Sequence, residues 1–124
     1  MRAILIDPIE NSIEEFEHNG DINEIYEKIG NNCRTFEVPF VDENTESKDS
    51  YFCDEEALYK RVGGGVMPKK YRSDLPILGR VVVLGFDPAS GESVDCTTPL
   101  EYFSENVCLL GTEEIFHIFT RLRA

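Results

Sequence analysis

Four cysteines have the widest range of chemistry among the side chains of this 124-residue sequence. They are widely spread, with no C-x-x-C pair and no histidine at a spacing typical of a zinc site, so we expect no bound metal. The N-terminal residues lack the basic segment and long apolar run of an export signal, which favours a cytosolic protein. Because disulfides are rare in the cytosol, we expect reduced thiols at all four positions, Cys33, Cys53, Cys96 and Cys108.

No acid, base and nucleophile come together in a recognisable catalytic pattern. His18 lies in an acidic segment and His117 in an apolar one, where a packed or surface histidine is more common than a general base. Ser90-Gly91 lacks the context of a nucleophile elbow, and no cysteine is next to a histidine. The sequence therefore predicts a protein that is not an enzyme and that uses no cofactor.

A cluster of basic residues surrounds three consecutive glycines. Glycine lets backbone amides approach an anion, and lysine or arginine adds positive charge, so this segment is a candidate site for a phosphate-bearing ligand such as a nucleotide. It lacks the G-x-x-x-x-G-K-[ST] order of a P-loop, and the more common interpretation is a mobile loop whose cations pair with acidic residues of the same chain or of a second subunit. The candidate residues are Lys60, Arg61, Gly63, Gly64, Gly65, Lys69, Lys70 and Arg72.

The formal net charge of −12 is confined to the first half of the chain. Residues 1–59 contain 16 Asp or Glu against 4 Lys or Arg, whereas residues 60–124 contain 8 of each. This distribution argues against direct binding to nucleic acid, which draws its affinity from basic side chains. An acidic run can instead occupy the basic groove of another protein, or be a solvated loop and an acidic helix start. The candidate partner-binding residues are Asp42, Glu43, Glu46, Asp49, Asp54, Glu55 and Glu56.

Short apolar and alternating runs predict a sheet. We expect a buried strand over residues 3–6, an edge strand over 13–18, and a strand over 33–41 in which Pro39 indicates a sheet edge. Further strands are predicted over 51–53, 79–86 and 107–110, and residues 92–96 pair back on 79–86 as a hairpin. Polar composition predicts a loop over 42–50, and an irregular segment with glycines and prolines predicts a long loop at about 60–78.

Helical periodicity is clearest over residues 21–30. Asp21 is placed to cap this helix, Glu24 to complete a capping box, and Gly30 to end it. A short acidic helix start is expected at 54–59, and a second capped helix at Thr98 and Pro99. The apolar spacing of 115–122 favours a C-terminal helix, with Arg121 and Arg123 near its end, although its aromatic content leaves a strand open.

These elements predict an α+β fold in one domain, residues 1–124, with a small mainly antiparallel sheet and two or three helices packed on it. The order strand, strand, helix occurs twice, and the first strand of each unit ends at Ile6-Asp7-Pro8 or at Phe86-Asp87-Pro88. This order is compatible with an internal duplication and with coincidence, because aspartate-proline turns are common. No apolar run approaches the length of a membrane span, so no membrane association is expected.

Four segments carry a resemblance to a known family, namely residues 3–8 (AILIDP), 25–30 (IYEKIG), 53–58 (CDEEAL) and 76–85 (PILGRVVVLG). In this order and spacing the sequence resembles the DUF3846 family of small proteins of bacteria, phages and other mobile elements. The resemblance implies an accessory role in the cytosol of a bacterial host. It implies no mechanism, because the family brings no assigned activity or catalytic residues.

Two functions follow as hypotheses. The first is a non-enzymatic phage or mobile-element accessory protein that binds a host protein through its acidic segment, as an anti-defence inhibitor would. The second is a binder of a phosphate-bearing small molecule or signalling nucleotide through the basic glycine-rich loop. The predicted edge strands are also compatible with a homodimer.

Overall fold

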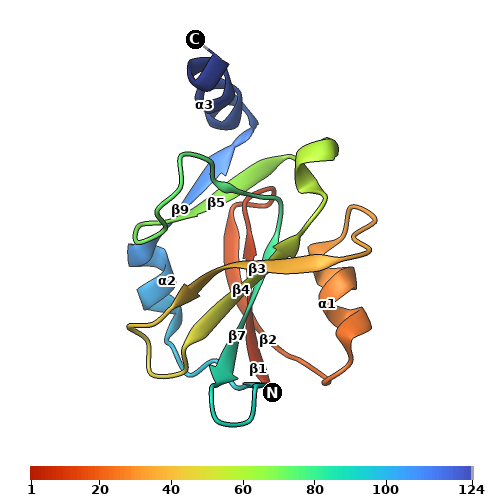
Figure 1. Cartoon of the computed structure of the whole chain (residues 1–124), viewed down its shortest axis with the longest axis vertical. Helices are drawn as coiled ribbons and strands as arrows, with labels where there is room; N and C mark the ends of the chain where they lie inside the picture. The colour runs from red at the N-terminus through yellow and green to blue at the C-terminus, as the bar shows by residue number, and fades with distance from the viewer. Residues whose placement is uncertain (124) are drawn as a thin grey trace.

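The larger sheet has six antiparallel strands, drawn from both halves of the chain in a computed structural model that describes residues 1–123. Its strands are β1 (Arg2–Asp7), β2 (Ser12–Glu17), β3 (Phe36–Asp42), β4 (Asp49–Asp54), β7 (Val81–Asp87) and β8 (Glu92–Val94). Their order is β2, β1, β7, β4, β3 (Figure 1). Strand β8 pairs with the end of β7. In the middle of the sheet Ile4 lies opposite Val83 of β7, and Val83 in turn lies opposite Tyr51 of β4.

Every strand predicted for this sheet is confirmed. The two strands predicted for the edges, β2 and β3, are the two ends of the strand order. Pro39 falls where the pairing of β3 with β4 changes register, between Glu37 and Phe40, which fits a residue that cannot donate to the ladder. The predicted loop over residues 42–50 is too long, because β4 already begins at Asp49 and all six of its residues are buried.

The smaller sheet corrects the prediction of a long irregular loop at 60–78. Here β5 (Gly64–Pro68) pairs with β6 (Ile77–Leu78) on one side and with β9 (Val107–Gly111) on the other. A Cβ atom at Gly64 would lie only 2.6 Å from the carbonyl oxygen of Leu110, and one at Gly65 only 2.6 Å from Cδ1 of Ile115. The glycines therefore allow β5 to pack closely against its neighbours, and they mark a strand rather than a flexible loop.

The helix predicted over residues 21–30 is confirmed as α1 (Ile22–Ile29). Asp21 caps it by accepting a hydrogen bond from the amide of Asn23 at 2.9 Å, and Gly30 follows it with φ 69°. The predicted capping box is wrong. Glu24 instead accepts the amide hydrogen of Asn19 at 3.0 Å and contacts Nδ1 of His18 at 2.6 Å, so it joins α1 to the end of β2.

The second predicted helix is confirmed as α2 (Leu100–Asn106), but its start is not the predicted one. Pro99 stands at the cap position, and no side chain caps the helix. The hydroxyl of Thr98 donates to the buried carboxylate of Asp49 at 2.5 Å instead. The acidic helix start at 54–59 is a single turn, the 3₁₀ helix η1 (Ala57–Tyr59).

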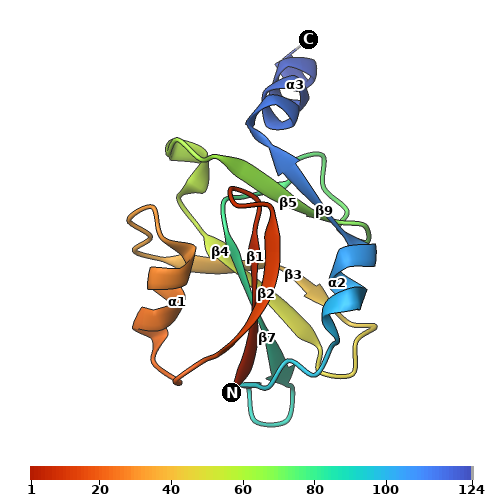
Figure 2. The ribbon, with the colours of Figure 1, turned by 180° about the vertical axis from the view of Figure 1, so that it is seen from behind.

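Alternating side chains of the larger sheet form two cores on its opposite faces. Phe103 of α2 packs in one core with Ile4, whereas Ile25 of α1 packs in the other with Ala3, the adjacent residue of β1. Figures 1 and 2 show the two helices on opposite sides of the sheet. Both predicted strand–strand–helix units are therefore present. If they were related by the two-fold axis between the antiparallel strands β1 and β7, however, both helices would lie on the same face of the sheet.

The apolar C-terminal segment is a helix, α3 (Thr112–Arg123), and not the alternative strand. It follows β9 directly, and Ile115 in its first turn packs with Ala57 and Leu78. Beyond this anchor α3 extends away from the two sheets (Figures 1 and 2). Within residues 1–123 no helix is long and apolar enough to cross a membrane.

Candidate functional site

A short turn after β4 presents two large apolar side chains to solvent. Leu58 is 60% exposed and Tyr59 is 89% exposed, next to the exposed carboxylates of Glu55 and Glu56. We call these four residues the η1 surface. An almost fully exposed tyrosine in an ordered turn is a feature that folding alone does not require.

Polar contacts of Asp54 and Lys60 hold this turn in place. The carboxylate of Asp54, at the end of β4, accepts the amide hydrogen of Glu56 at 2.9 Å and pairs with the ammonium group of Lys60 at 2.6 Å. Lys60 also donates to the carbonyl oxygens of Asn31 and Asn32, each at 3.0 Å. The turn is therefore tied both to β4 and to the segment that follows α1.

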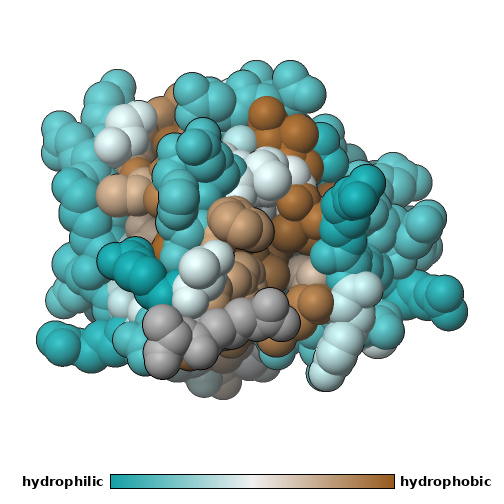
Figure 3. All heavy atoms as spheres, turned by 90° about the horizontal axis from the view of Figure 1, so that it is seen from above, coloured by the Kyte–Doolittle hydropathy of each residue, from teal (hydrophilic) through white to brown (hydrophobic). Residues whose placement is uncertain are grey.

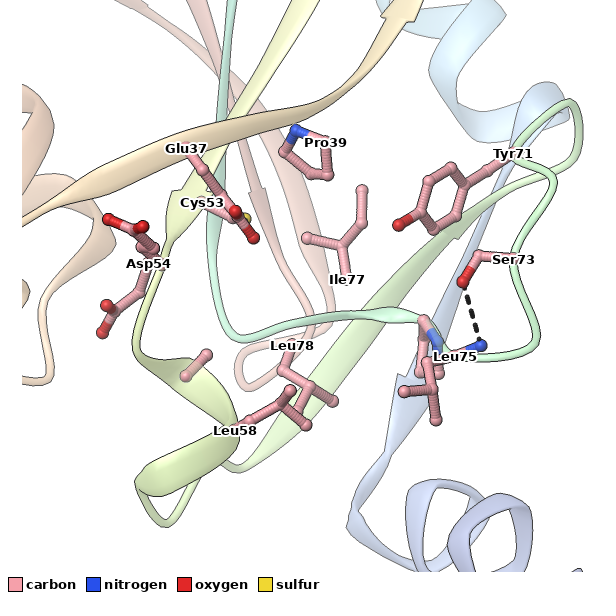
Figure 4. A pocket seen from close by; sticks show the side chains of 13 residues that line it. Glu37, Pro39, Cys53, Asp54, Leu58, Tyr71, Ser73, Leu75, Ile77 and Leu78 are labelled. Atoms are coloured by element: carbon pink, nitrogen blue, oxygen red, sulfur yellow. Dashed lines mark hydrogen bonds between the residues drawn. The ribbon is translucent and has the colours of Figure 1, made fainter. Parts of the chain in front are cut away.

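A pocket of about 160 Å³ lies beside the η1 surface, between the edge of the larger sheet and β6. We call it the junction pocket. Figure 4 shows Glu37 and Tyr71 entering it from opposite sides above Ile77, with Leu58 and Leu78 along its lower side. Acidic groups thus lie at the margin of an apolar hollow. This arrangement suits a long basic side chain, which has an apolar stem and a positively charged head. The lining residues are Glu37, Pro39, Cys53, Asp54, Glu55, Ala57, Leu58, Tyr71, Ser73, Leu75, Pro76, Ile77 and Leu78.

The thiol in the junction pocket is poorly suited to nucleophilic chemistry. Burial, with the nearby carboxylates of Glu37 and Asp54, raises the pKa of Cys53 from 9.0 to about 12. The thiol therefore stays protonated at neutral pH, whereas the thiolate is the reactive form.

The two histidines are also accounted for. His18 is buried against Glu24, whose pKa is lowered by the hydrogen bond from the Asn19 amide and by His18 itself. His117 is an exposed residue of α3, 4.0 Å from Glu113 one turn earlier. Among residues 1–123 no group of three His, Cys, Asp or Glu side chains is placed to hold a metal ion.

The structure divides the acidic segment into buried and exposed residues. Asp42, Asp49 and Asp54 lie inside the fold, at 4%, 0% and 6% exposure, and so cannot form the surface contacts predicted for them. The four glutamates remain exposed, but Glu43 and Glu46 lie at one end of β4 and Glu55 and Glu56 at the other. Six strand residues span roughly 20 Å, so the predicted acidic surface is two separate pairs.

The predicted anion site is divided as well. Lys60, Arg61 and the glycines lie at the start of β5, whereas Lys69, Lys70 and Arg72 follow its end. Lys60 is already paired with Asp54, and Gly64 and Gly65 are buried strand residues. The structure therefore does not bring these eight residues together around one ligand.

The second basic group lies beside an open hollow of about 640 Å³, formed by residues 69–74. Lys70 donates to the hydroxyl of Tyr102 at 3.2 Å, and that hydroxyl donates to Asp42 at 2.6 Å. The hydrogen bond to Tyr102 and the charge of Asp42 raise the pKa of Lys70, so it is cationic at neutral pH. Lys69 and Arg72 are exposed at the same hollow.

The η1 surface and the junction pocket were not predicted as sites from the sequence. The pocket combines side chains from β3, β4 and the segment 71–78, and nothing in the linear order places these together. The one available signal was the pair Leu58-Tyr59, which lies one residue after an acidic run and has no periodic apolar partner.

Comparison with known proteins adds no relative: no family model, curated protein or solved structure matches this chain. The resemblance to the DUF3846 family stays a prediction.

Proposed function

We propose that this chain is a non-enzymatic accessory protein of a phage or mobile element that binds a host protein through the η1 surface. The observation that carries the proposal is the exposure of Tyr59 and Leu58 beside the carboxylates of Glu55 and Glu56. Tyrosine is enriched among the residues that dominate protein interfaces. Surrounding charge of one sign speeds encounter with a partner of opposite sign and sets specificity.

The chemistry of the expected partner follows from these groups. Its surface carries an apolar contact for Tyr59 and at least one lysine or arginine opposite Glu55 and Glu56. A long basic side chain also fits the junction pocket, with its stem against Ile77 and its head near Glu37. Inhibition of a host defence protein is one use of such a contact.

The state of the reactive groups supports a non-enzymatic role. The Cys53 thiol has a raised pKa, and His18 is already paired with Glu24. The junction pocket therefore offers contacts for binding but no activated nucleophile.

A salt-eluted affinity capture from bacterial lysate tests the proposal. The tagged wild-type chain is expected to retain one host protein in stoichiometric amount and to release it as salt rises, because exposed charges are screened. Tyr59→Ala and the double variant Glu55→Lys/Glu56→Lys should each reduce the captured amount by about tenfold or more, which corresponds to about 1.4 kcal/mol of binding free energy.

The control has the same change of charge at the other end of β4. Glu43→Lys/Glu46→Lys alters the net charge as much as the test variant, but away from the η1 surface. This control should keep the captured protein. Equal losses in the two double variants would show a general charge effect, and no capture at low salt would rule the proposal out.

A second candidate function rests on the hollow formed by residues 69–74. Lys69, Lys70 and Arg72 border it and could hold a phosphate-bearing small molecule such as a nucleotide. Native mass spectrometry with added ATP should show a bound species that Lys69→Gln/Arg72→Gln loses and that Lys28→Gln/Arg34→Gln keeps. Equal loss in both variants, or no bound ATP in the wild type, would exclude this function.

A further inference from the structure

Helix α3 exposes apolar side chains over much of its surface. It is anchored in its first turn by Ile115, which is 8% exposed and packs with Ala57 and Leu78, and one turn later by the half-buried Phe119, which packs against the same cluster. Phe116 is 66% exposed and Leu122 is 52% exposed. Figure 3 views the molecule from this end and shows hydrophobic residues gathered in a band between hydrophilic margins.

The side of α3 that carries Leu122 borders an open groove of about 460 Å³. Ile118, Arg121 and Leu122 form one wall of the groove, and Met67 and Asp74 contribute to the other side. The groove is long enough to admit an apolar ridge, because its helical wall extends over more than one turn.

Charge along the same side of α3 changes sign from its start to its end. Glu114, Ile118 and Arg121 stand at positions i, i+4 and i+7, so they lie on one stripe of the helix, and Leu122 lies next to it. An acidic residue therefore precedes Ile118 and a basic residue follows it, and Leu122 lies one residue beyond that basic residue. A helix that runs antiparallel to α3 and has the same sequence presents the opposite charge at each end.

We propose that this face of α3 binds α3 of a second copy of the chain, antiparallel and about a two-fold axis. In such an isologous contact Glu114 of each copy lies opposite Arg121 of the other, Ile118 of both copies packs between these ion pairs, and Leu122 of each copy extends the apolar contact just beyond Arg121. The contact is self-complementary because the two ends of the stripe carry charges of opposite sign. It does not depend on the function proposed for the η1 surface.

The charge of the whole chain favours the same end for self-association. Residues 1–59 carry 16 acidic and 4 basic residues, and two copies that met through this half would repel each other. Residues 60–124 are balanced, with 8 of each sign. A contact through α3 therefore brings together the least repulsive parts of the two chains.

The size of the contact sets its strength. A helix of 12 residues is about 18 Å long, so a pair of these helices buries less than the roughly 1,600 Å² of a standard interface. The dimer is accordingly weak and forms at protein concentrations of about 10–100 μM rather than at nanomolar levels.

Sedimentation equilibrium of the purified full chain provides the first test. The mass is expected to rise from the 14.1 kDa of one chain towards twice that value as concentration increases. Leu122→Asp should remove the concentration dependence. Leu58→Asp, the same substitution at an exposed leucine of the η1 surface, should leave it unchanged, which separates the dimer from the binding function.

Two charge-reversed variants test the antiparallel arrangement. Glu114→Arg and Arg121→Glu should each be monomeric alone, because like charges then meet at both ends of the contact. An equimolar mixture should form a heterodimer, since each arginine again faces a glutamate. This rescue separates a lost contact from a damaged helix, which matters because Glu114 also accepts the amide hydrogen of Gly111 at the start of α3.

Three results would overturn the proposal. They are a wild-type chain that stays monomeric at about 500 μM, well above the expected dissociation range, a dimer that survives Leu122→Asp, and a mixture of the two reversed variants that stays monomeric. Loss of the captured host protein in Leu122→Asp, with a monomeric wild type, would assign this face to a different partner.

Discussion

At the scale of the residue, the carboxylate of Asp49 is the clearest case of a polar group with a purely structural role. It is fully buried, and it accepts hydrogen bonds from the hydroxyls of Ser47 and Thr98 at 2.5 Å each. The thiol of Cys96 lies 3.4 Å from the same carboxylate. These contacts tie the turn before β4 to the segment before α2, which are about 50 residues apart in the sequence.

Removing one donor should cost stability. Thr98→Val keeps the shape of the side chain but leaves the buried Asp49 with one hydrogen bond fewer, so we expect unfolding free energy to fall by about 1–3 kcal/mol. Urea denaturation measures this loss. Thr120→Val removes a threonine hydroxyl from an exposed position of α3 and should change stability by less than about 0.5 kcal/mol. Similar losses in both variants would contradict the role assigned to Thr98.

The buried thiols predict a loss of stability at alkaline pH. Burial is the main cause that raises the pKa of Cys53 from 9.0 to about 12 and that of Cys96 to about 11. In the unfolded chain both thiols lose their protons near pH 9, whereas the folded chain keeps them. Their contribution is therefore complete below about pH 9 and is lost progressively as the pH rises towards 11–12.

Urea midpoints measured from about pH 7.5 to pH 10.5 should fall above pH 9. Cys53→Ala should make this fall shallower. Cys108→Ala, at an exposed cysteine, should leave the pH dependence as it is in the wild type. A decline of the same slope in all three proteins would mean that the buried thiols do not cause it.

At the scale of the element, β5 shows why a strand can be hidden in a glycine-rich segment. Gly64 and Gly65 have no side chain that could reveal an alternating pattern, yet both are buried between β6 and β9. Glycine is required here because neighbouring atoms approach the backbone closely. The sequence alone suggested two other reasons for the glycines, a flexible loop or an anion-binding site. The local sequence pattern predicts a loop, whereas close packing in the tertiary structure requires glycine in a strand, and the strand is what forms.

Substitution at two adjacent glycines separates these interpretations. In Gly64→Ala the new methyl group meets the backbone oxygen of Leu110 at 2.6 Å, so the strand must shift, and we expect a loss of about 1–3 kcal/mol. In Gly63→Ala the nearest atom, at 3.0 Å, is on the flexible side chain of Ile9, and the loss should be smaller. Chemical denaturation compares the two. A larger loss in Gly63→Ala would contradict the packing explanation.

At the scale of the whole molecule, the separation of charge governs both stability and association. The net charge of −12 arises entirely within residues 1–59. Part of this charge is neutralised inside the fold, since Asp54 pairs with Lys60 and Asp7 pairs with Arg80 at 2.9 Å. The exposed glutamates are left to repel one another in the folded state.

Added salt should therefore stabilise the protein. Raising NaCl from about 10 mM to about 500 mM shortens the screening length from about 30 Å to a few ångströms, which weakens repulsion among the exposed glutamates. We expect the midpoint of thermal unfolding to increase by a few degrees. Glu43→Lys/Glu46→Lys lowers the net negative charge and should respond less to salt. A decrease of the midpoint with salt would show that the ion pairs outweigh the repulsion.

Periodicity and turn chemistry were sufficient to predict most elements of this fold. The strands of the larger sheet, α1 with its Asp21 cap, and the α+β class follow from apolar spacing and local turn residues. Partners that are distant in the sequence could not be predicted in this way. Thr98 has the sequence context of a helix cap, but its hydroxyl donates to the buried carboxylate of Asp49 and does not cap α2.

The candidate site was harder to predict than the fold. An acidic run and a basic glycine-rich segment could be recognised in the sequence. In the structure, however, three aspartates of the acidic run are buried, and β5 separates the basic residues into two groups. Burial depends on which strand faces are covered, and composition alone does not reveal it. The exposure of Tyr59 could not be predicted either, because the turn that carries it is held by distant contacts, of Lys60 with the segment after α1 and of Ala57 with β6.

The central pairing of β1 with β7 also has a consequence for synthesis on the ribosome. Ile4 pairs with Val83, which is 79 positions later in the chain. At a translation rate of about 5–20 residues per second, the apolar run of β1 waits roughly 4–16 s before its neighbour exists. During that interval β1 can pair only with β2, so its other edge stays exposed as a hydrophobic strand edge that chaperones can recognise. The central part of the larger sheet therefore forms only late in translation.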